Sequence, residues 1–443
     1  MSQSATPSLL FAPPAPLPLA VDFLGGRLTS DGGWCWVAAA DAALGLTTAL
    51  AAVVPEWRRR RGRHAPVELV RQRVYQLVAG YEDQNDADTL RGDPLLKLVC
   101  GRLPESDPDL ASQPTFSRFE NAFSARDCYR LAEALGQVYL REREREGHPT
   151  HIVLDLDSTD DPTHGEQEGS AYHGYFRQAM YHPLLVFDGT TGQFITAILR
   201  PGNAHAGAGA LAILKRVVAR LRARWPEVTI EVRADAGFAK PEIYAFCEQQ
   251  GIAYTIGLVT NPRLERLAAP LLAEALAQQA AADGARVRLL AEDIYQADSW
   301  PAPRRVIIKA EALVKGPNTR FVVTTRDDPP EALYSWYTAR GETENWIKDL
   351  KTACFGDRLS CHRFLANQVR LLLHGAAYWL LDTLRRWLMQ VGSERLCLET
   401  VRLRLIKIGD RVRELATRSH LRLASSHPGE PLWYLLATRA DRS

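Results

Sequence analysis

Five side chains that could bind or cleave a phosphodiester lie in one short segment, from Tyr334 to Ala353. They are Tyr337, Arg340, Glu344, Lys348 and Lys351. At about 100° per residue, a single helix here places all five within a sector of roughly 80°. The residues that point away are Trp346, Ala339, Leu350 and Ile347. Such amphipathic helices are usually surface helices with i,i+4 ion pairs. A carboxylate among cations and a phenol could instead hold a divalent ion or act as an acid while its neighbours grip an anion, which suits phosphodiester chemistry.

Two more carboxylates stand where predicted strands end. IVLDLD, residues 152–157, and TIEVRAD, residues 229–235, are short, branched and apolar, which is typical of buried strands. A carboxylate inside such a strand needs a partner or a metal, because burying it alone is costly. Asp157 is better placed for this than Asp155, which shares its strand face and remains the alternative. Strand-end aspartates also commonly form turns or cap helices.

The order of elements after residue 150 predicts a ribonuclease H-like fold. Three antiparallel strands are followed by a helix, a strand, a helix and a strand. The strands are expected at 152–157, 181–188, 193–200, 229–235 and 253–258, and the helices at 208–224 and 241–250. In that fold the first and fourth strands lie side by side, so Asp157 and Asp235 would converge at one edge.

The predicted fold class is therefore α/β, with this core carrying an inserted, mostly β subdomain and flanked by helical N-terminal and C-terminal domains. The insertion is expected to hold a helix at 266–279 and strands at 286–290, 304–310 and 320–325. The expected segments are an extended Pro-rich arm (1–24), a helical DNA-binding domain (25–150), the core in two parts (151–260 and 329–392), the insertion (261–328) and a basic helical region (393–443), whose residues 396–423 could also form a hairpin.

Other residues are candidate DNA contacts. Residues 112–123 could form part of a helix-turn-helix capped by Ser112 and read DNA through Gln113, Thr115, Ser117 and Arg118, although helices that pack for their own sake fit equally well. Trp300 could stack on a displaced base, although a core tryptophan is the commoner case.

Composition excludes several classes of protein. The chain has 443 residues, 46% hydrophobic and 24% charged, as in soluble globular proteins. Dispersed cysteines without a CxxC pair predict reduced thiols in a cytoplasmic protein and no zinc site. Prolines in the N-terminal arm argue against a signal peptide, and charges within residues 371–389 argue against a membrane span.

The net charge of +2 gives by itself no argument for nucleic acid. The cations are clustered, however, at 58–61 with Arg63, and again near the C-terminus. The second cluster comprises Arg402, Arg404, Lys407, Arg411, Arg413, Arg418 and Arg422. Such clusters are usually solvated faces, and beside a nuclease-like centre they become candidate DNA contacts, with a subunit interface as the alternative for the second.

Motifs along nearly the whole chain resemble the group-one DDE transposases of bacterial insertion sequences, the set called thirteen-eighty. They are GGRLTSDGG, RQRVYQLVAGYEDQNDADTLRGDP, ASQPTFSRFENA, LDLDSTDDPTHGEQEG, RADAGF and YTARGETENWIKDLK. The gaps of two, three and six residues that separate Tyr337, Arg340, Glu344 and Lys351 also resemble the tyrosine-arginine-glutamate-lysine signature of these enzymes.

The resemblance implies a role for each of these residues. Asp157, Asp235 and Glu344 would form the metal-binding and catalytic triad. Tyr337, Arg340 and Lys351 would hold DNA phosphates, with Lys348 helping. Two Mg²⁺ ions about 3.5–4 Å apart would serve the reaction, with Mn²⁺ as a substitute.

The resemblance also implies the partners: a homodimer on the inverted-repeat ends of its own element and on target DNA, with strand cleavage, strand transfer and a hairpin route in related enzymes. A bacterial, nucleoid-associated protein is expected. Two alternatives stay open, a retired transposase that only binds DNA and a non-transposing nuclease of the same fold.

Overall fold

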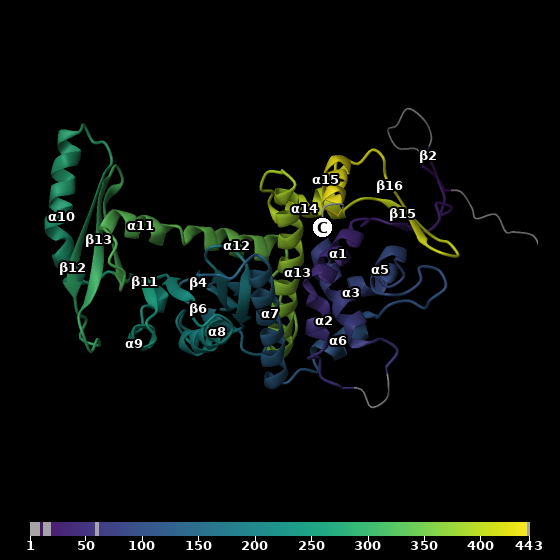
Figure 1. Cartoon of the computed structure of the whole chain (residues 1–443), viewed down its shortest axis with the longest axis horizontal. Helices are drawn as coiled ribbons and strands as arrows, with labels where there is room; N and C mark the ends of the chain where they lie inside the picture. The colour runs from purple at the N-terminus through teal and green to yellow at the C-terminus, as the bar shows by residue number, and fades with distance from the viewer. Residues whose placement is uncertain (1–8, 12–18, 58–61, 441–443) are drawn as a thin grey trace, which may run out of the picture. The chain divides into compact units, whose positions relative to one another are not determined.

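The structure is a computed structural model that describes residues 9–11, 19–57 and 62–440 (Figure 1). The chain divides into two compact units. The core unit comprises Leu44–Trp57 and Phe119–Trp379, and the flanking unit comprises Met1–Ala43, Arg58–Arg118 and Leu380–Ser443. The predicted catalytic residues all belong to the core unit. The finer segment boundaries stay predictions.

The core unit is built on one eight-stranded mixed sheet with the order β12-β13-β14-β11-β10-β4-β8-β9. Five neighbouring strands at one end of this order are β4 (His151–Ser158), β8 (Leu184–Asp188), β9 (Phe194–Ile198), β10 (Thr229–Ala234) and β11 (Ala253–Leu258). β4, β8 and β9 form an antiparallel meander, while β10 and β11 run parallel to β4. This is the ribonuclease H-like order, so the predicted fold class is confirmed.

The predicted neighbourhood of the first and fourth strands is also confirmed. β4 pairs directly with β10, and Leu156 lies opposite Ala234. Both strands are almost wholly buried, as central parallel strands are. Because each aspartate follows one of these paired residues, Asp157 and Asp235 emerge at the same edge of the sheet.

Helices and a small sheet complete the centre of the core unit. The helices are α2 (Leu46–Ala51), α7 (Ala125–Arg145), α8 (Ala210–Arg224), α9 (Pro241–Gln249) and α13 (Phe364–Gln390). A capping box between Ser124 and Asp127 begins α7, and Pro241 in the first turn begins α9. The small sheet is formed by β5 (Asp161–Pro162), β6 (Ala171–His173) and β7 (Gln178–Tyr181).

The segment after β11 lengthens the same sheet. It consists of α10 (Pro262–Ala281), β12 (Val287–Tyr295), β13 (Arg304–Leu313) and β14 (Gly316–Thr324). β14 pairs antiparallel with β11, so the three strands extend the core sheet at one side (Figure 1). The elements lie where the sequence predicts them, and each is longer than expected.

The segment 334–353 is not one helix, which corrects the prediction. It holds the end of α11 (Pro330–Thr338) and all of α12 (Gly341–Thr352). The break precedes Gly341, a poor helix former, and it leaves Ala339 exposed instead of turned inward. Ala339 and Arg340 keep right-handed helical dihedrals, so α12 continues α11 end to end (Figure 1). As predicted, Trp346, Ile347 and Leu350 are buried.

The flanking unit is mostly helical but not entirely so. Its helices are α1 (Trp34–Leu44), α3 (Pro66–Ala79), α4 (Asp86–Leu90), α5 (Pro94–Val99), α6 (Gln113–Glu120), α14 (Leu398–Val401), η2 (Arg402–Ile406) and α15 (Glu430–Ala440). β15 (Asp410–Glu414) and β16 (Ser419–Leu423) form a hairpin that pairs with β3 (Leu28–Thr29). The hairpin alternative therefore holds for this part of the C-terminal region, and the helical one does not.

Parts of the predicted N-terminal features lie outside the described residues. Of the arm, β1 (Leu9–Phe11) pairs with β2 (Leu19–Val21). The cluster of arginines at 58–61 is not among the described residues. Within the described part of the chain, no helix is long and apolar enough to span a membrane.

Candidate active site

Arg340 joins two of the three predicted catalytic carboxylates. Its Nη1 donates to Oδ2 of Asp157 at 2.8 Å, and its Nη2 lies 3.4 Å from Oε1 of Glu344. Asp157 comes from β4, whereas Arg340 and Glu344 lie one turn apart where α12 begins. One guanidinium thus holds a strand carboxylate and a helix carboxylate together.

Asp235 completes the cluster electrostatically. Burial raises the pKa of Asp157 to about 6, Arg340 opposes that rise, and the carboxylates of Asp235 and Glu344 add to it. Burial would lower the pKa of Arg340, but Asp157, Tyr337, Asp235 and Glu344 raise it on balance. Asp157 is therefore near enough to Asp235 and to Glu344 to be repelled by each of them.

Asp235 also shapes the local backbone. Its Oδ1 accepts a hydrogen bond from the backbone N–H of Gly237 at 2.8 Å, which caps the short helix η1 (Ala236–Phe238). Asp235 therefore caps a helix, which is the common role of aspartates at strand ends. Capping does not remove it from the neighbourhood of Asp157, because β4 and β10 are paired.

The donor set suits a hard divalent ion. Three carboxylates with little other ligand chemistry are typical of Mg²⁺ and Mn²⁺ sites. In the described residues, no group of three or more His, Cys, Asp and Glu side chains is arranged to hold a metal ion. The guanidinium of Arg340 bonds to two of the three predicted metal ligands, Asp157 and Glu344.

Asp155, the alternative to Asp157, has a different task. Its two oxygens accept hydrogen bonds from Nε and Nη2 of Arg233, both at 2.7 Å, and Oδ2 also accepts from the Thr343 hydroxyl at 2.8 Å. Nη1 of Arg233 donates to the carbonyl of Trp336. Asp155 is fully buried, so this pair ties β4 and β10 to α11 and α12. Asp155 is thus already paired within the core, and the assignment of Asp157 as the first metal ligand stays a prediction.

The remaining members of the signature lie around this centre. The Tyr337 hydroxyl lies over Gly257, where a Cβ would approach it to 2.7 Å, so a larger residue at 257 would displace the phenol. Burial raises the pKa of Tyr337, which keeps it neutral. Lys351 bonds to Oδ1 and the carbonyl of Asp160 at 2.9 and 3.0 Å, and Lys348 is exposed.

Two residues predicted to contact DNA, Trp300 and Arg118, differ in their exposure to solvent. Trp300 is only 7% exposed and packs edge-on against Tyr244 and Tyr295, with ring centroids 5.3 and 5.4 Å away. Its faces are covered by the core, so the prediction that it stacks on a base is not supported and the core alternative is. Arg118 is exposed on α6.

The sequence reasoning missed Asp160, Arg233 and Thr343. Asp160 holds Lys351 and also accepts a hydrogen bond from Gln178 at 3.0 Å. A signal for Arg233 was present, because it lies two residues before Asp235 just as Asp155 lies two residues before Asp157, and paired strands place these two side by side. No pattern in the sequence pointed to Thr343.

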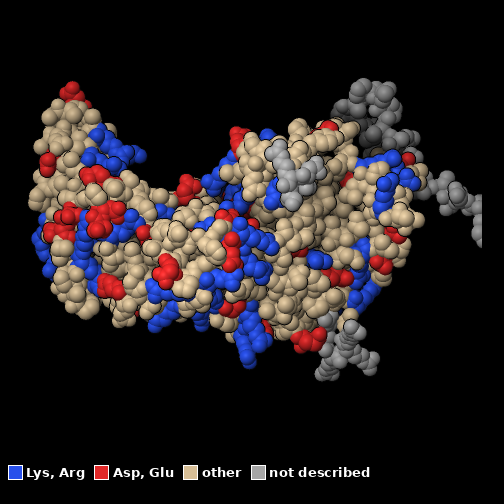
Figure 2. All heavy atoms as spheres, in the orientation of Figure 1, with Lys and Arg blue, Asp and Glu red and all other residues tan. Residues whose placement is uncertain are grey.

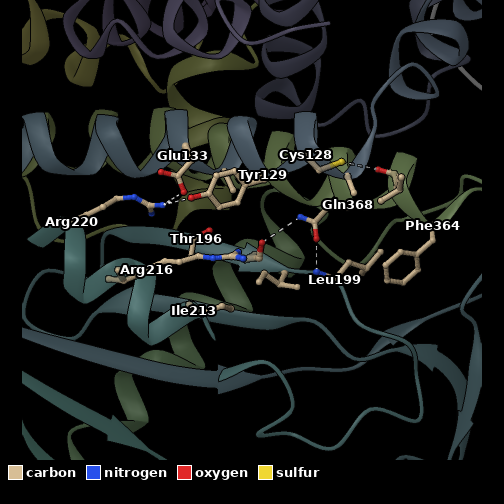
Figure 3. A pocket seen from close by; sticks show the side chains of 16 residues that line it. Cys128, Tyr129, Glu133, Thr196, Leu199, Ile213, Arg216, Arg220, Phe364 and Gln368 are labelled. Atoms are coloured by element: carbon tan, nitrogen blue, oxygen red, sulfur yellow. Dashed lines mark hydrogen bonds and ion pairs between the residues drawn. The ribbon is translucent and has the colours of Figure 1, made fainter. Parts of the chain in front are cut away.

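A cavity of about 230 Å³ opens elsewhere in the core unit, between α7, α8, β9 and α13 (Figure 3). The charged side chains that line it have partners in its wall. Arg220 forms an ion pair with Glu133 and donates to the Tyr129 hydroxyl at 3.3 Å, and Arg216 lies over the Tyr129 ring. Gln368 on its wall bonds to the backbone of Leu199 and Ala197 in or beside β9. None of the predicted site residues lines this cavity.

Asp161, close to the site, yields a stability prediction. It is 1% exposed, both of its oxygens lack a hydrogen-bond partner among the described residues, and burial raises its pKa well above the usual range. A raised folded-state pKa means that stability is lost as pH rises from the unfolded pKa of about 3.9 towards the folded value. We expect Asp161→Asn to raise the free energy of unfolding at neutral pH, because the neutral amide does not need to take up a proton on folding.

Denaturation midpoints between pH 4 and pH 8 check this expectation. The gap between variant and wild type should widen as pH rises and close near pH 4. A constant gap, or a less stable variant at pH 8, would show that Asp161 is charged and paired in the folded protein.

Comparison with known proteins identifies the family of the chain. A family model described as transposase DDE domain group 1 matches residues 13–443. None of the curated proteins compared matches the chain. Among solved structures, that of the piggyBac transposase synaptic complex with hairpin DNA matches at 11% sequence identity and a TM-score of 0.42, over 86% of this chain and 80% of that one. A similarity of that size says nothing about activity. Because the family model covers nearly the entire chain, the protein belongs to the family of transposase DDE domain group 1.

Proposed function

We propose that the protein is an active DNA transposase of a bacterial insertion sequence, of the set called thirteen-eighty with the tyrosine-arginine-glutamate-lysine signature. It binds the inverted-repeat ends of its element as a homodimer, cleaves them with Mg²⁺ or Mn²⁺, and joins them to target DNA. The observation that supports the proposal is that Arg340 bonds to both Asp157 of β4 and Glu344 of α12, while Asp235 follows β10, the strand that pairs with β4.

The proposed role of each signature residue follows from its position in the site. Divalent ions held by the three carboxylates would supply an activated water and charge stabilisation at the leaving oxygen. Tyr337 and Arg340 adjoin the carboxylates, so they can contact the phosphate at the cleavage point. Lys351 is held beside the loop after Asp157 through Asp160, and Lys348 is exposed one turn after Glu344, so both can contact the neighbouring backbone. The freed 3′-OH then acts as nucleophile at the same centre.

The experiment is a cleavage and strand-transfer assay with purified protein, Mg²⁺, and a duplex carrying the repeats that flank the gene. Cleaved ends and joined products are expected. Cleavage without joined products would identify a non-transposing nuclease. Binding without cleavage would identify a retired transposase that acts as a DNA-binding regulator.

A second set of cations supports DNA binding by the flanking unit. Arg411, Arg413, His420 and Arg422 are exposed on β15 and β16, where Arg411 lies opposite Arg422 and Arg413 opposite His420. Figure 2 shows Lys and Arg side chains gathered over this hairpin. Like charges placed opposite each other are destabilising, and the two acids of the hairpin strands do not offset them, because Asp410 is buried and Glu414 bonds to Ser106. This basic face suits a phosphate backbone.

We expect the triple variant with Arg411, Arg413 and Arg422 changed to Gln to bind DNA more weakly and with less salt dependence. For every phosphate that the variant no longer neutralises, the log-log slope of affinity against salt should fall by about 0.9. Binding titrations from 50 to 200 mM salt measure it. Arg130→Gln, at an exposed arginine of α7 near Asp127, is the matched control and should leave the slope unchanged. An unchanged slope in the triple variant would show that these three arginines do not contact DNA phosphates and only form part of the solvated surface.

A further inference from the structure

Arg340 is bonded to the carboxylates that are proposed to hold the divalent ion. Its two terminal nitrogens reach Oδ2 of Asp157 and Oε1 of Glu344, and its side chain is 17% exposed. A guanidinium and a divalent ion are both attracted to carboxylate oxygens. Two cations at the same pair of carboxylates repel each other, so the binding of one weakens the binding of the other.

We infer that Arg340 competes with divalent ions for Asp157 and Glu344, and that a DNA phosphate relieves this competition by giving Arg340 a new partner. The inference rests on the proposed function and adds its regulation: the ions and the DNA end promote each other's binding. A phosphate matches the fork of arginine as well as a carboxylate does, so the exchange keeps the guanidinium paired.

The surroundings of Arg340 permit such an exchange. The residue stands at the junction between α11 and α12, at the N-terminal end of α12. Buried contacts of Trp346, Ile347 and Leu350 hold α12 from its other side, so the Arg340 side chain can turn without loosening the helix. The Glu344 side chain is 67% exposed, so ions and DNA can reach it from solvent.

The other cations of the signature are placed differently. Lys351 is paired with Asp160, and Lys348 is exposed, with no ion pair to Asp157 or Glu344 among the described contacts. Arg340 and Lys348 therefore carry the same charge, one before and one within α12, but differ in contact with the predicted metal ligands. This difference provides a matched control.

The first test measures ions without DNA. Titration calorimetry with Mn²⁺ is expected to show tighter binding to Arg340→Gln than to wild type by roughly tenfold or more, the factor that corresponds to one hydrogen bond between charged groups. Lys348→Gln should bind Mn²⁺ like wild type, apart from a small effect of net charge. Equal affinities in wild type and Arg340→Gln, or an equal gain in Lys348→Gln, would overturn the competition.

Thermal unfolding shows whether the Arg340→Gln variant is folded, and it gives a second measure of ion binding. Without divalent ions, Arg340→Gln should unfold at a lower temperature than wild type, because three mutually repelling carboxylates lose their shared cation. Mn²⁺ should raise its midpoint by more than it raises that of wild type. Arg340→Lys, which keeps one charge but not the fork, should fall between the two. An equal rise in all three proteins would contradict the inference.

The second test measures the coupling to DNA. Affinity for a duplex carrying the flanking repeats is compared with and without Ca²⁺, so that binding is measured apart from cleavage in Mg²⁺. Because coupling is reciprocal, Ca²⁺ should tighten DNA binding by wild type and much less by Arg340→Gln. Equal tightening would refute the coupling. If wild type binds no such duplex, the proposed function fails, whereas the DNA-free ion titration still decides whether Arg340 and the ion compete.

Discussion

Glu344→Gln is expected to lose cleavage of element ends by roughly 10³-fold or more, because a lost metal ligand removes several kcal/mol of transition-state stabilisation. The side chain of Glu344 is largely exposed and bonds to Arg340. The substitution keeps its shape and removes its charge, so the fold and the affinity for DNA should be nearly unchanged. Single-turnover cleavage in Mg²⁺, with a binding titration on the same duplex, measures both.

Glu331→Gln is the matched control, since Glu331 is an exposed glutamate in the first turn of the neighbouring α11. It should cleave like wild type. If Glu344→Gln also cleaved like wild type, Glu344 would not be a metal ligand, and α12 would merely be a surface helix.

Arg233→Met is expected to destabilise the protein by about 3–5 kcal/mol, because it leaves the carboxylate of Asp155 buried without its partner. The pair is bidentate, both side chains are almost fully buried, and Arg233 also donates to the carbonyl of Trp336 on α11. The loss should appear in chemical denaturation. Cleavage should fall as well, because the pair fixes the helices that carry Arg340 and Glu344.

A double-mutant cycle separates the lost partner from the lost packing. Asp155→Leu combined with Arg233→Met should be less destabilising than the sum of the two single changes, because apolar replacement of both partners leaves no unpaired charge. Additive losses would mean that the two side chains act independently and that the pair does not hold the sheet to the helices.

The central part of the fold could be predicted because local patterns determine it. Short apolar strands ending on aspartate, with helices between them, define the ribonuclease H-like order, and the observed pairing of β4 with β10 follows that order. The single helix expected over 334–353 was wrong because the apolar spacing continues across Gly341, whereas the backbone hydrogen bonds there join residues three apart instead of four. The spacing of apolar residues predicts which side of a helix is buried. It does not change when one residue, here Gly341, is a poor helix former.

Contacts between distant residues were harder to predict. Arg340 and Asp157 are 183 positions apart, and their hydrogen bond depends on side-chain rotamers that no spacing encodes. The sequence grouped Arg340 with the phosphate-binding cations, and the structure pairs it with acids. The burial of Trp300 likewise depends on Tyr244 and Tyr295, from α9 and β12, so its position in a loop gave no sign of it.

The continuity of the core sheet limits how the chain can be shortened. β11 carries β10 on one side and β14 on the other, with register pairs from Thr255–Thr324 to Leu258–Phe321. Excising residues 262–326 to obtain a smaller enzyme would bare the backbone of a buried apolar strand, and such an edge recruits strands from other molecules. A minimal version of this protein would therefore precipitate unless a substitute strand or charged residues were built along β11.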